Sequence, residues 1–438
     1  MGYKNLKALV VNASQEVNYS QEFKDKAIEK MKKAGTHPGS KSLRKWGTVE
    51  LVDPKNQSGD LPTRNHQSGQ FNYADKVNAK ALDNYVYQNT GCYSCPIRCS
   101  RLSKVENGDY QAEIEGPEYE TINSMGPMVD NHDMELIIYA NKLCNEYGID
   151  TISTGVIISF AMECHEKGIL DDEELSLEWG DKETITELIK KIAFREGLGD
   201  LLAEGCYRAA KKIGQGAEEL AMHVKKMEIP MQEPRASKAM GLGHATSNRG
   251  ADHLYGLPTI DLTGNVEVAE KYFSEYMPQI LEVYSQKYKP EMLSFTQEYN
   301  AISDALGVCK FSTTENFALL PEDIAEGISL LREDLDFDEE ELLKAGERII
   351  NLERMYNYRH GMTRSADNLP ERFLKDSLNI YEVEKDNKLT DKVVVENLKV
   401  DLDQMLDIYY QLRGWNQKGV PTEEKLKELD MEELIKDL

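Results

Sequence analysis

Several stretches in the first half of the chain place apolar residues three or four positions apart and end at a glycine. That spacing puts the apolar side chains on one face of an α-helix, and glycine commonly ends a helix because it adopts left-handed backbone angles without steric cost. The connections are short, so we expect neighbouring helices to pack antiparallel. The pattern predicts helices at residues 134–147, with Asn131 as the cap, and at 154–167, 185–192 and 201–213.

The second half continues with longer helical patterns, at residues 266–288, 292–306, 321–332 and 339–359 and in an acidic tail from Thr422. Pro230 and Pro234 forbid a continuous helix, so we place a domain boundary there. β structure is expected only near the start, as a buried strand at 6–11 and a second strand at 48–52 in the loop-rich segment 37–70, with a helix at 21–34 between them. The fold class is therefore mainly α, or α+β overall, and its expected parts are residues 1–14, 15–222 and 223–438.

The composition argues against several classes of partner. The chain has 438 residues and a formal charge of -25, which repels nucleic-acid phosphates and anionic lipid surfaces. Its longest apolar run, residues 156–162, is too short to cross a bilayer, and the first residues contain no apolar signal core. We therefore expect a cytoplasmic protein without nucleic-acid or membrane partners.

Cysteine spacing gives the first indication of chemistry. Cys92, Cys95 and Cys99 form a C-x2-C-x3-C pattern, whose thiolates can converge on one soft metal centre, and Cys309 is the best candidate for a fourth ligand. The spacing alone leaves a structural zinc site open, because zinc also accepts four thiolates. The remaining cysteines stand among apolar neighbours in helical patterns and are expected to be small buried side chains: Cys144, Cys164 and Cys206.

Six short motifs stand at residues 92–99, 116–121, 147–155, 245–250, 304–309 and 351–354. Together they resemble the tungsten-containing aldehyde:ferredoxin oxidoreductase family. They occur in the order of that family over nearly the whole chain, although each alone would be a weak signal. The resemblance implies two helical domains of that family type, and it implies that the four cysteines hold a [4Fe-4S] cluster beside tungsten, or molybdenum, bound by two pterins, with magnesium as a further expected ion.

The family holds its pterins in two loops that share a pattern of Asp, two residues, Gly, an aliphatic residue, then Asp or Cys. The resemblance assigns Asn145, Gly148, Ile149 and Asp150 to the first loop, and the second consists of Asp304, Gly307, Val308 and the cluster ligand Cys309. Asn145 departs from the pattern because an amide supplies no charge, so we expect a weaker hold on one pterin. Simpler roles stay open, with Asp150 as a helix cap and Asp304 as a solvated helix residue.

For catalysis, the resemblance implies that Glu120 and His253 lie next to the metal. A glutamate acting as base and a histidine donating to the carbonyl oxygen would serve the oxidation of a small aldehyde to a carboxylic acid. Electrons would then pass through the cluster to ferredoxin. Taken singly, each residue would more often be structural, and only the joint match with the family motifs favours the catalytic role.

The start of the chain resembles the end of the family's N-terminal β domain, so residues 1–14 are expected to be a remnant of it. The expected explanations are a truncated product or a partner chain that supplies the missing base. Tyr139 replaces the glutamate with which some relatives bind a metal between subunits, so a homodimer would need other contacts. Two alternatives remain open: a non-catalytic iron-sulfur electron-transfer subunit of the same family, and a zinc-stabilised helical binding protein.

Overall fold

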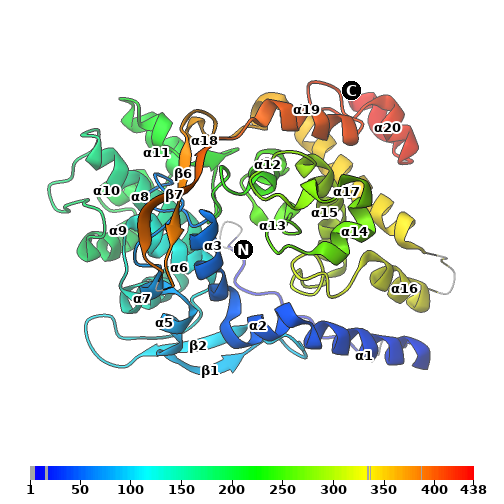
Figure 1. Cartoon of the computed structure of the whole chain (residues 1–438), viewed down its shortest axis with the longest axis horizontal. Helices are drawn as coiled ribbons and strands as arrows, with labels where there is room; N and C mark the ends of the chain where they lie inside the picture. The colour runs from blue at the N-terminus through cyan, green and yellow to red at the C-terminus, as the bar shows by residue number, and fades with distance from the viewer. Residues whose placement is uncertain (1–4, 15–17, 333–334, 336, 386) are drawn as a thin grey trace.

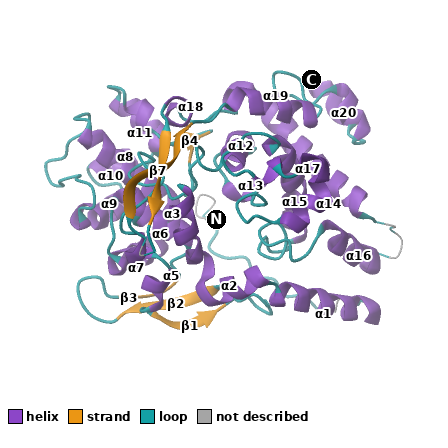
Figure 2. Cartoon of the chain, in the orientation of Figure 1, coloured by secondary structure: helices purple, strands orange, loops and turns teal. Residues whose placement is uncertain are grey.

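The structure is a computed structural model that describes residues 5–14, 18–332, 335, 337–385 and 387–438. Helices dominate these residues, and the strands form three small antiparallel sheets (Figure 1, Figure 2). The predicted fold class, mainly α, is confirmed. No helix in the described ranges is both long and apolar enough to span a bilayer.

Helices before residue 222 cover most of the first half. They are α1 (Gln21–Thr36), α2 (Pro38–Trp46), α3 (Val52–Ser58), α4 (Ala74–Val77), α5 (Ala79–Asp83), α6 (Tyr119–Met125), α7 (Met134–Tyr147), α8 (Thr151–Glu166), α9 (Lys182–Phe194), α10 (Leu198–Leu202) and α11 (Cys206–Ile213). The second half contains α12 (Lys238–Thr246), α13 (His253–Gly256), α14 (Val266–Phe273), α15 (Lys289–Leu306), α16 (Pro321–Leu331), α17 (Glu339–Arg359), α18 (Glu371–Lys375), α19 (Leu402–Leu412) and α20 (Glu423–Glu428).

Strands β1 (Val86–Thr90), β2 (Ser100–Val105) and β3 (Ala112–Glu115) form the largest sheet. A short pair, β4 (His223–Val224) and β5 (Met227–Glu228), follows α11, and a hairpin of β6 (Leu378–Val383) and β7 (Leu389–Leu398) lies late in the chain. The sequence did not predict these sheets, because most of their strands have six residues or fewer and the longest, β7, is largely solvent-exposed. The β1–β2 connection is the segment that carries the three clustered cysteines.

Capping side chains explain where the predicted helices begin and end. Helix α7 has the predicted bounds, but its cap is Asp133, which accepts from the Glu135 amide at 3.0 Å, and the predicted cap Asn131 instead accepts from the Asp133 amide. Helix α9 ends at Phe194, because Arg195 after it adopts a left-handed conformation, and the first glycine that follows is Gly197. The segment predicted as one helix at 201–213 is interrupted, because Gly205 has a φ of +83°.

The buried strand predicted at residues 6–11 is wrong. This segment has no regular structure, and Leu9, Val10 and Val11 are 78%, 88% and 88% exposed. A strand needs a neighbour to bond its backbone N–H and C=O groups, and none of the described strands pairs with this segment. Of the remnant predicted for residues 1–14, residues 5–14 are exposed and without regular structure, and the first four residues lie outside the described part.

Two further predictions are corrected. The strand expected at 48–52 is a 3-10 turn, Gly47–Leu51, that leads into α3; Val49 and Val52 are both fully buried, and residues three apart share a face in a helical turn. The helix expected at 266–288 stops at Phe273, and short turns follow around Pro278, whose nitrogen cannot donate a hydrogen bond. The other helices predicted beyond residue 290 are confirmed within a few residues.

The main apolar core draws on both halves of the chain. It includes Ile137 and Phe160 from the first half together with Leu293 and Tyr409 from the second. A smaller core around Tyr299 and other residues of α14 and α15 lies beside it. The division into parts at residues 14 and 222 stays a prediction.

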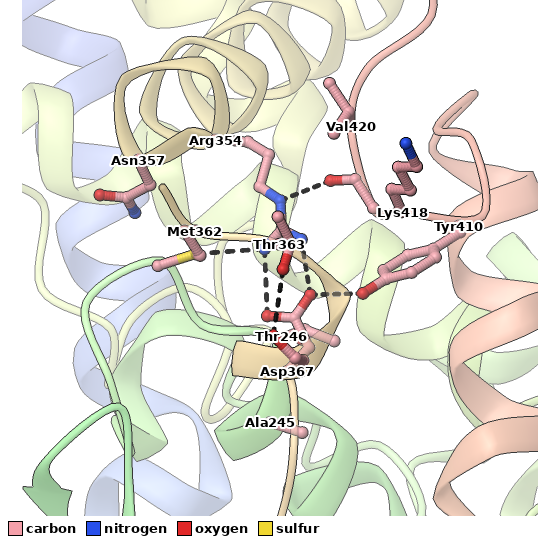
Figure 3. A network of polar contacts seen from close by, with 12 residues as sticks. Ala245, Thr246, Arg354, Asn357, Met362, Thr363, Asp367, Tyr410, Lys418 and Val420 are labelled. Carbon is pink, nitrogen blue, oxygen red and sulfur yellow. Dashed lines mark hydrogen bonds and ion pairs between the residues drawn. The ribbon is translucent and has the colours of Figure 1, made fainter. Parts of the chain in front are cut away.

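A buried carboxylate joins four segments of the second half (Figure 3). Asp367 accepts two bonds from Arg354 of α17, at 3.0 and 2.7 Å, and one from the Tyr410 hydroxyl of α19 at 2.5 Å. Lys225, in the β4–β5 turn, pairs with the same carboxylate at 2.9 Å. Burial alone would raise the pKa of Asp367, but the charges of Lys225 and Arg354 outweigh it and lower that pKa, so the group is ionised.

Candidate active site

The two residues predicted to be catalytic lie side by side. Glu120 is the second residue of α6 and His253 is the first residue of α13, and His253 Nε2 lies 3.6 Å from Glu120 Oε1. Both side chains are partly exposed, at 17% and 20%, so a substrate can reach them. Asp252 caps α13 through the Leu254 amide and so fixes the backbone next to His253.

Glu120 is held by two further donors from one loop. The Met231 amide donates to its Oε2 at 2.8 Å, and the Gln232 side-chain amide donates to its Oε1 at 2.6 Å. The Tyr119 hydroxyl returns a bond to the Met231 carbonyl at 2.7 Å. Two N–H donors on one carboxylate fix its position, so this arrangement orients Glu120.

Buried charges hold the loop that contacts Glu120. Glu233 is fully buried, pairs with Arg235 at 2.7 Å and approaches His66 Nδ1 at 3.1 Å, and its own amide donates to Asp60 at 2.6 Å. Burial alone would raise the pKa of Glu233, but Arg235 and His66 hold this pKa at about 2. The pKa of His66 is lowered by burial, so His66 is neutral and its Nδ1–H donates to the carboxylate.

Glu120 and His253 face a cavity of about 640 Å³. Most of its exposed surface is apolar, although polar side chains also contribute to the lining. Such cavities suit small organic ligands that are oriented by a few polar contacts. The lining includes Leu51, Pro54, Met240, Leu254, Leu257, Leu262, Val283 and Phe311, together with Lys55, Asp60, Gln232, Cys309 and Glu315.

Three polar residues at or near the cavity belong to none of the sequence motifs and were not predicted as site residues. Desolvation raises the pKa of Glu315 to about 7. His244 of α12 is fully buried and neither of its ring nitrogens has a partner, and desolvation lowers its pKa to about 3, with the nearby charge of His253 as the next cause. The Oε1 atom of Gln232 also lacks a partner. Only the three-dimensional packing reveals these groups, because each stands in a sequence segment without a recognisable pattern.

The structure brings Cys309 toward the three clustered cysteines. Desolvation, the charge of Glu118 and the charges of Cys309 and Cys95 raise the pKa of Cys99 to about 11. The pKa of Cys309 is likewise raised, first by desolvation and then by the charges of Cys95 and Cys92. Thiols influence each other in this way only at close range. The four predicted ligands therefore share one region of the fold, although more than two hundred residues separate Cys309 from the others.

No three of the His, Cys, Asp and Glu side chains in the described ranges are arranged to hold a metal ion. The cysteine segment is open to solvent, with Cys92 and Cys309 exposed and Cys95 and Cys99 half-buried. Cys144, Cys164 and Cys206 are fully buried, as predicted. The cluster and its ligands thus stay a prediction, whereas the distinction between the two groups of cysteines is confirmed.

The two predicted pterin loops have the same backbone turn. Helix α7 ends with bonds from the Gly148 amide to Asn145 and from the Ile149 amide to Cys144, at 3.3 and 3.0 Å. Helix α15 ends with the equivalent bonds, from Gly307 to Asp304 and from Val308 to Ser303, at 3.2 and 2.9 Å. This double-bonded ending requires a left-handed residue, and the two glycines have φ values of +70° and +68°.

Both glycines face open space, because a Cβ atom added to Gly148 or Gly307 would meet no atom within 4 Å. A flat ligand can therefore approach the backbone at either turn. Asp150 accepts from the Ser153 amide at 2.7 Å and caps α8, so its simpler role is confirmed. Asp304 is 67% exposed and pairs with Lys310, and Asn145 donates to the Asn141 carbonyl at 2.8 Å.

Comparison with known proteins gives a consistent result. A family model described as aldehyde ferredoxin oxidoreductase, domains 2 & 3, matches residues 25–431. The chain is 38% identical over 445 residues to the tungsten-containing aldehyde ferredoxin oxidoreductases of Pyrococcus furiosus and of Thermococcus kodakarensis. Each alignment covers 99% of this chain and 68% of the relative.

More distant similarity extends to two other proteins. The WOR-like subunit of an aliphatic sulfonate oxidoreductase from Pyrococcus furiosus is 28% identical, with 99% of this chain and 65% of that protein covered. The active-site complex BamBC of benzoyl coenzyme A reductase, solved with 1,5-dienoyl-CoA, superimposes with a TM-score of 0.70 at 20% identity. That superposition covers 94% of this chain and 65% of the other, and it shows a shared fold.

Proposed function

Since the chain belongs to the aldehyde ferredoxin oxidoreductase family, we propose that it oxidises a small aldehyde to a carboxylic acid and passes the two electrons to ferredoxin. The cofactors in this proposal are a tungsten bis-pterin and a [4Fe-4S] cluster. The proposal concerns the assembled enzyme, because the matched region is 68% of the length of the first two relatives.

Four cysteines in one region of the fold support the proposed cluster, although no three of the described side chains are arranged to hold a single metal ion. Cys92, Cys95 and Cys99 lie on the β1–β2 connection and Cys309 follows α15, and the pKa values of Cys99 and Cys309 rise partly through the charges of their cysteine neighbours. Four crowded thiols are unfavourable as separate thiolates, and iron ions relieve that repulsion by binding them. We propose these four as the cluster ligands.

The residues also fit two pterins. Gly148 and Gly307 leave room beside two matching helix ends, where a flat ring can contact the backbone. In the second loop, the exposed Asp304 carboxylate can accept N–H bonds from a pterin edge, and Val308 connects it to Cys309. In the first loop, Asn145, Ile149 and Asp150 take the equivalent places, with Asp150 already engaged as a cap.

When bound, the tungsten centre would supply the two-electron acceptor for the reaction. Conversion of an aldehyde to an acid adds one oxygen from water and releases two electrons and two protons. In our proposal Glu120 accepts a proton, and its Met231 and Gln232 donors hold the carboxylate in place for that transfer. His253 donates an N–H bond to the carbonyl oxygen and so stabilises the charge that develops there.

The cavity gives the proposed reaction its substrate selectivity. Its apolar surface would bind the hydrocarbon part of an aldehyde, whereas Glu120 and His253 mark the polar end at which the carbonyl group would lie. An apolar cavity also excludes water and so strengthens the hydrogen bonds formed inside it. Small aliphatic and aromatic aldehydes are therefore the expected substrates.

One observation carries the proposal: Glu120 and His253, predicted together as catalytic residues from the family motifs, approach to 3.6 Å in the lining of a cavity that Cys309 also lines. The site thus combines an acid-base pair with a predicted electron-transfer ligand.

The test is anaerobic purification of the protein in its cellular assembly, followed by metal analysis and by assays with aldehydes. Tungsten and iron together, with aldehyde-dependent reduction of a viologen dye and of ferredoxin, are the expected results. Iron without tungsten would contradict the proposal and indicate an electron-transfer subunit. Zinc alone would also contradict it and indicate a zinc-stabilised binding protein.

A further inference from the structure

The strongest positive charge of this acidic protein is concentrated next to the cysteine segment. Residues 24–45 contain eight Lys or Arg against two Asp or Glu, whereas the whole chain has a net charge of -25. These residues form α1 and α2, which lie with β1 and β2 along one edge of the molecule (Figure 1). A cluster of positive side chains on an acidic protein requires an explanation, because charged side chains at the surface contribute nothing to the apolar core.

Helix α2 and the end of α1 pack directly on the cysteine segment. Arg44 donates to the carbonyls of Pro96 and Ile97, at 2.6 and 3.2 Å, and to that of Gly35 at 2.8 Å. A Cβ atom on Gly35 would lie 2.9 Å from Pro96, so the end of α1 contacts the cysteine segment without space between them. The two helices are therefore fixed next to the predicted cluster ligands.

Helix α1 carries two separate rows of basic residues. Lys26, Lys30 and Lys33 point toward α16, where they pair with Asp323 and Glu326. Lys24 and Lys32 lie on the face that includes Gly35, since residues three or four apart share a helix face. The first row is used within the fold, and the second row faces solvent.

Five exposed basic residues form what we call the basic surface: Lys24, Lys32, Lys41, Lys45 and Arg98. Within the described residues, none of the five forms an ion pair; Lys45 contacts only the Trp46 ring, at 4.3 Å. Lys41 and Lys45 are one helical turn apart on α2, and Arg98 lies inside the cysteine segment, one residue before Cys99.

Exposed apolar side chains lie among these charges. Ile28 and Met31 are 40% and 46% exposed on the face of α1 between Lys24 and Lys32, and Tyr93, beside Cys92, is fully exposed. Apolar residues with a charged rim are the usual composition of a protein interface. The combination distinguishes this surface from an ordinary solvated helix face.

We propose that the basic surface is the docking site for a small acidic iron-sulfur protein of the ferredoxin type, which receives electrons through the cysteine segment. This inference rests on the proposed function and adds the place of electron exit. Positive charge around an exposed redox centre would steer an acidic partner and orient it with its own cluster toward Cys92. The net charge of -25 would repel the same partner elsewhere.

The test compares two acceptors in the assembled enzyme. The variant Lys32→Glu/Lys41→Glu/Lys45→Glu reverses three charges without touching a predicted ligand, and Lys418→Glu, at an exposed lysine between α19 and α20 on the opposite edge, is the matched control. We expect kcat/KM for an acidic ferredoxin to fall at least about tenfold in the triple variant. Reduction of a small viologen dye and the iron content should stay at the level of the control.

Salt gives an independent measurement. The Debye length falls from about 10 Å at 0.1 M to about 3 Å at 1 M ionic strength, so KM for ferredoxin should rise with salt in the parent enzyme and much less in the triple variant. Normal ferredoxin kinetics in a triple variant that retains its iron would overturn the inference.

Failure of the proposed function has a different signature. In that case neither ferredoxin nor dye is reduced with any aldehyde, and docking is then measured directly by calorimetric titration of the protein with oxidised ferredoxin. Binding that is lost in the triple variant and kept in Lys418→Glu supports the basic surface. Equal binding by all three proteins, or none by the parent, refutes it.

Discussion

Two sides of the cavity differ. On one side, buried polar contacts fix the position of Glu120, whereas on the other side Cys309 is exposed to solvent. Two N–H donors bind Glu120, and Glu233, Arg235 and His66 hold the loop that supplies them. On the other side, Cys309 is exposed, and the Asp304 carboxylate, 67% exposed, pairs with the nearby Lys310.

This difference separates two kinds of task. An acid-base residue must be oriented before its substrate arrives, because its geometry decides the barrier to proton transfer. Ligands of a cluster or a pterin gain their final contacts only when that group binds, and their segment must first be accessible. We infer that the Glu120 side is preorganised and that the Cys309 side is completed by its cofactors.

Among variants that distinguish the two sides, loss of a cluster ligand should have the largest effect on cofactor content and activity. In Cys309→Ser we expect the iron content to fall to background and ferredoxin reduction to disappear, because the Cys309 side would lack the cluster that completes it. Cys144→Ser removes a fully buried thiol instead and should keep its iron. Iron and visible absorption measured on both proteins check this, and a full iron content in Cys309→Ser would exclude Cys309 as a ligand.

Removal of charge from the preorganised side should lower the rate and spare the cofactors. Glu120→Gln keeps the size of the side chain but loses its basicity, so we expect kcat/KM for aldehyde to fall about 10²–10⁴-fold with tungsten and iron unchanged. Steady-state kinetics with a dye acceptor measure the effect. The exposed Glu113→Gln on β3 serves as control, and equal rates in the two variants would show that Glu120 takes no part in proton transfer.

Glu233, the buried carboxylate that holds the loop next to Glu120, should influence how the free energy of unfolding depends on acid pH. In the fold the pKa of Glu233 is about 2, against 4.5 in its ordinary state, so its stabilising contribution is complete above pH 4.5 and disappears as the pH falls toward 2. Glu233→Gln leaves Arg235 buried without its partner and should cost about 3–5 kcal/mol at pH 7. Urea denaturation from pH 7 to pH 3 should show this difference narrowing, and a constant difference would contradict the assigned charge.

The smallest expected effect concerns Glu315 on the open side. Its pKa is raised to about 7 by desolvation, so the parent protein loses stability as the pH rises from 4.5 through 7, when this carboxyl ionises. Glu315→Gln cannot ionise and should melt about 2 °C higher than the parent at pH 8, with a smaller difference at pH 5. A melting difference that is independent of pH would show that Glu315 is ionised throughout.

The sequence predicts local features of this fold well, because they depend on neighbours a few residues apart. Helical periodicity locates α7, α15, α16 and α17, and the glycine endings of α7 and α15 follow from the need for positive φ. Apolar composition alone misplaces the strand at 6–11, because a strand depends on a partner that a local pattern does not reveal. The short, polar strands of the β1–β3 sheet are missed because they have partners in the fold but no apolar pattern in the sequence.

Within the site, the pairing of Glu120 with His253 follows from family motifs, since no local pattern joins residues 133 positions apart. Gln232, His244 and Glu315 could not be found in this way. His244 and Gln232 have buried polar atoms without a hydrogen-bond partner, and burial raises the pKa of Glu315. Only the packed structure reveals these properties. Asp150 shows the converse case, in which an ordinary capping role was visible in the sequence beside the functional one.

The Asp367 carboxylate has a consequence for the dynamics of the second half. Because Arg354, Tyr410 and Lys225 all bind this single group, local opening of α17, α19 or the β4–β5 turn would remove one partner from a buried charge. These segments are then expected to open together as one cooperative unit, so that their backbone amides exchange with solvent only in rare, large fluctuations. Helix α15, which leads to Cys309, packs against both α17 and α19 and would share that support.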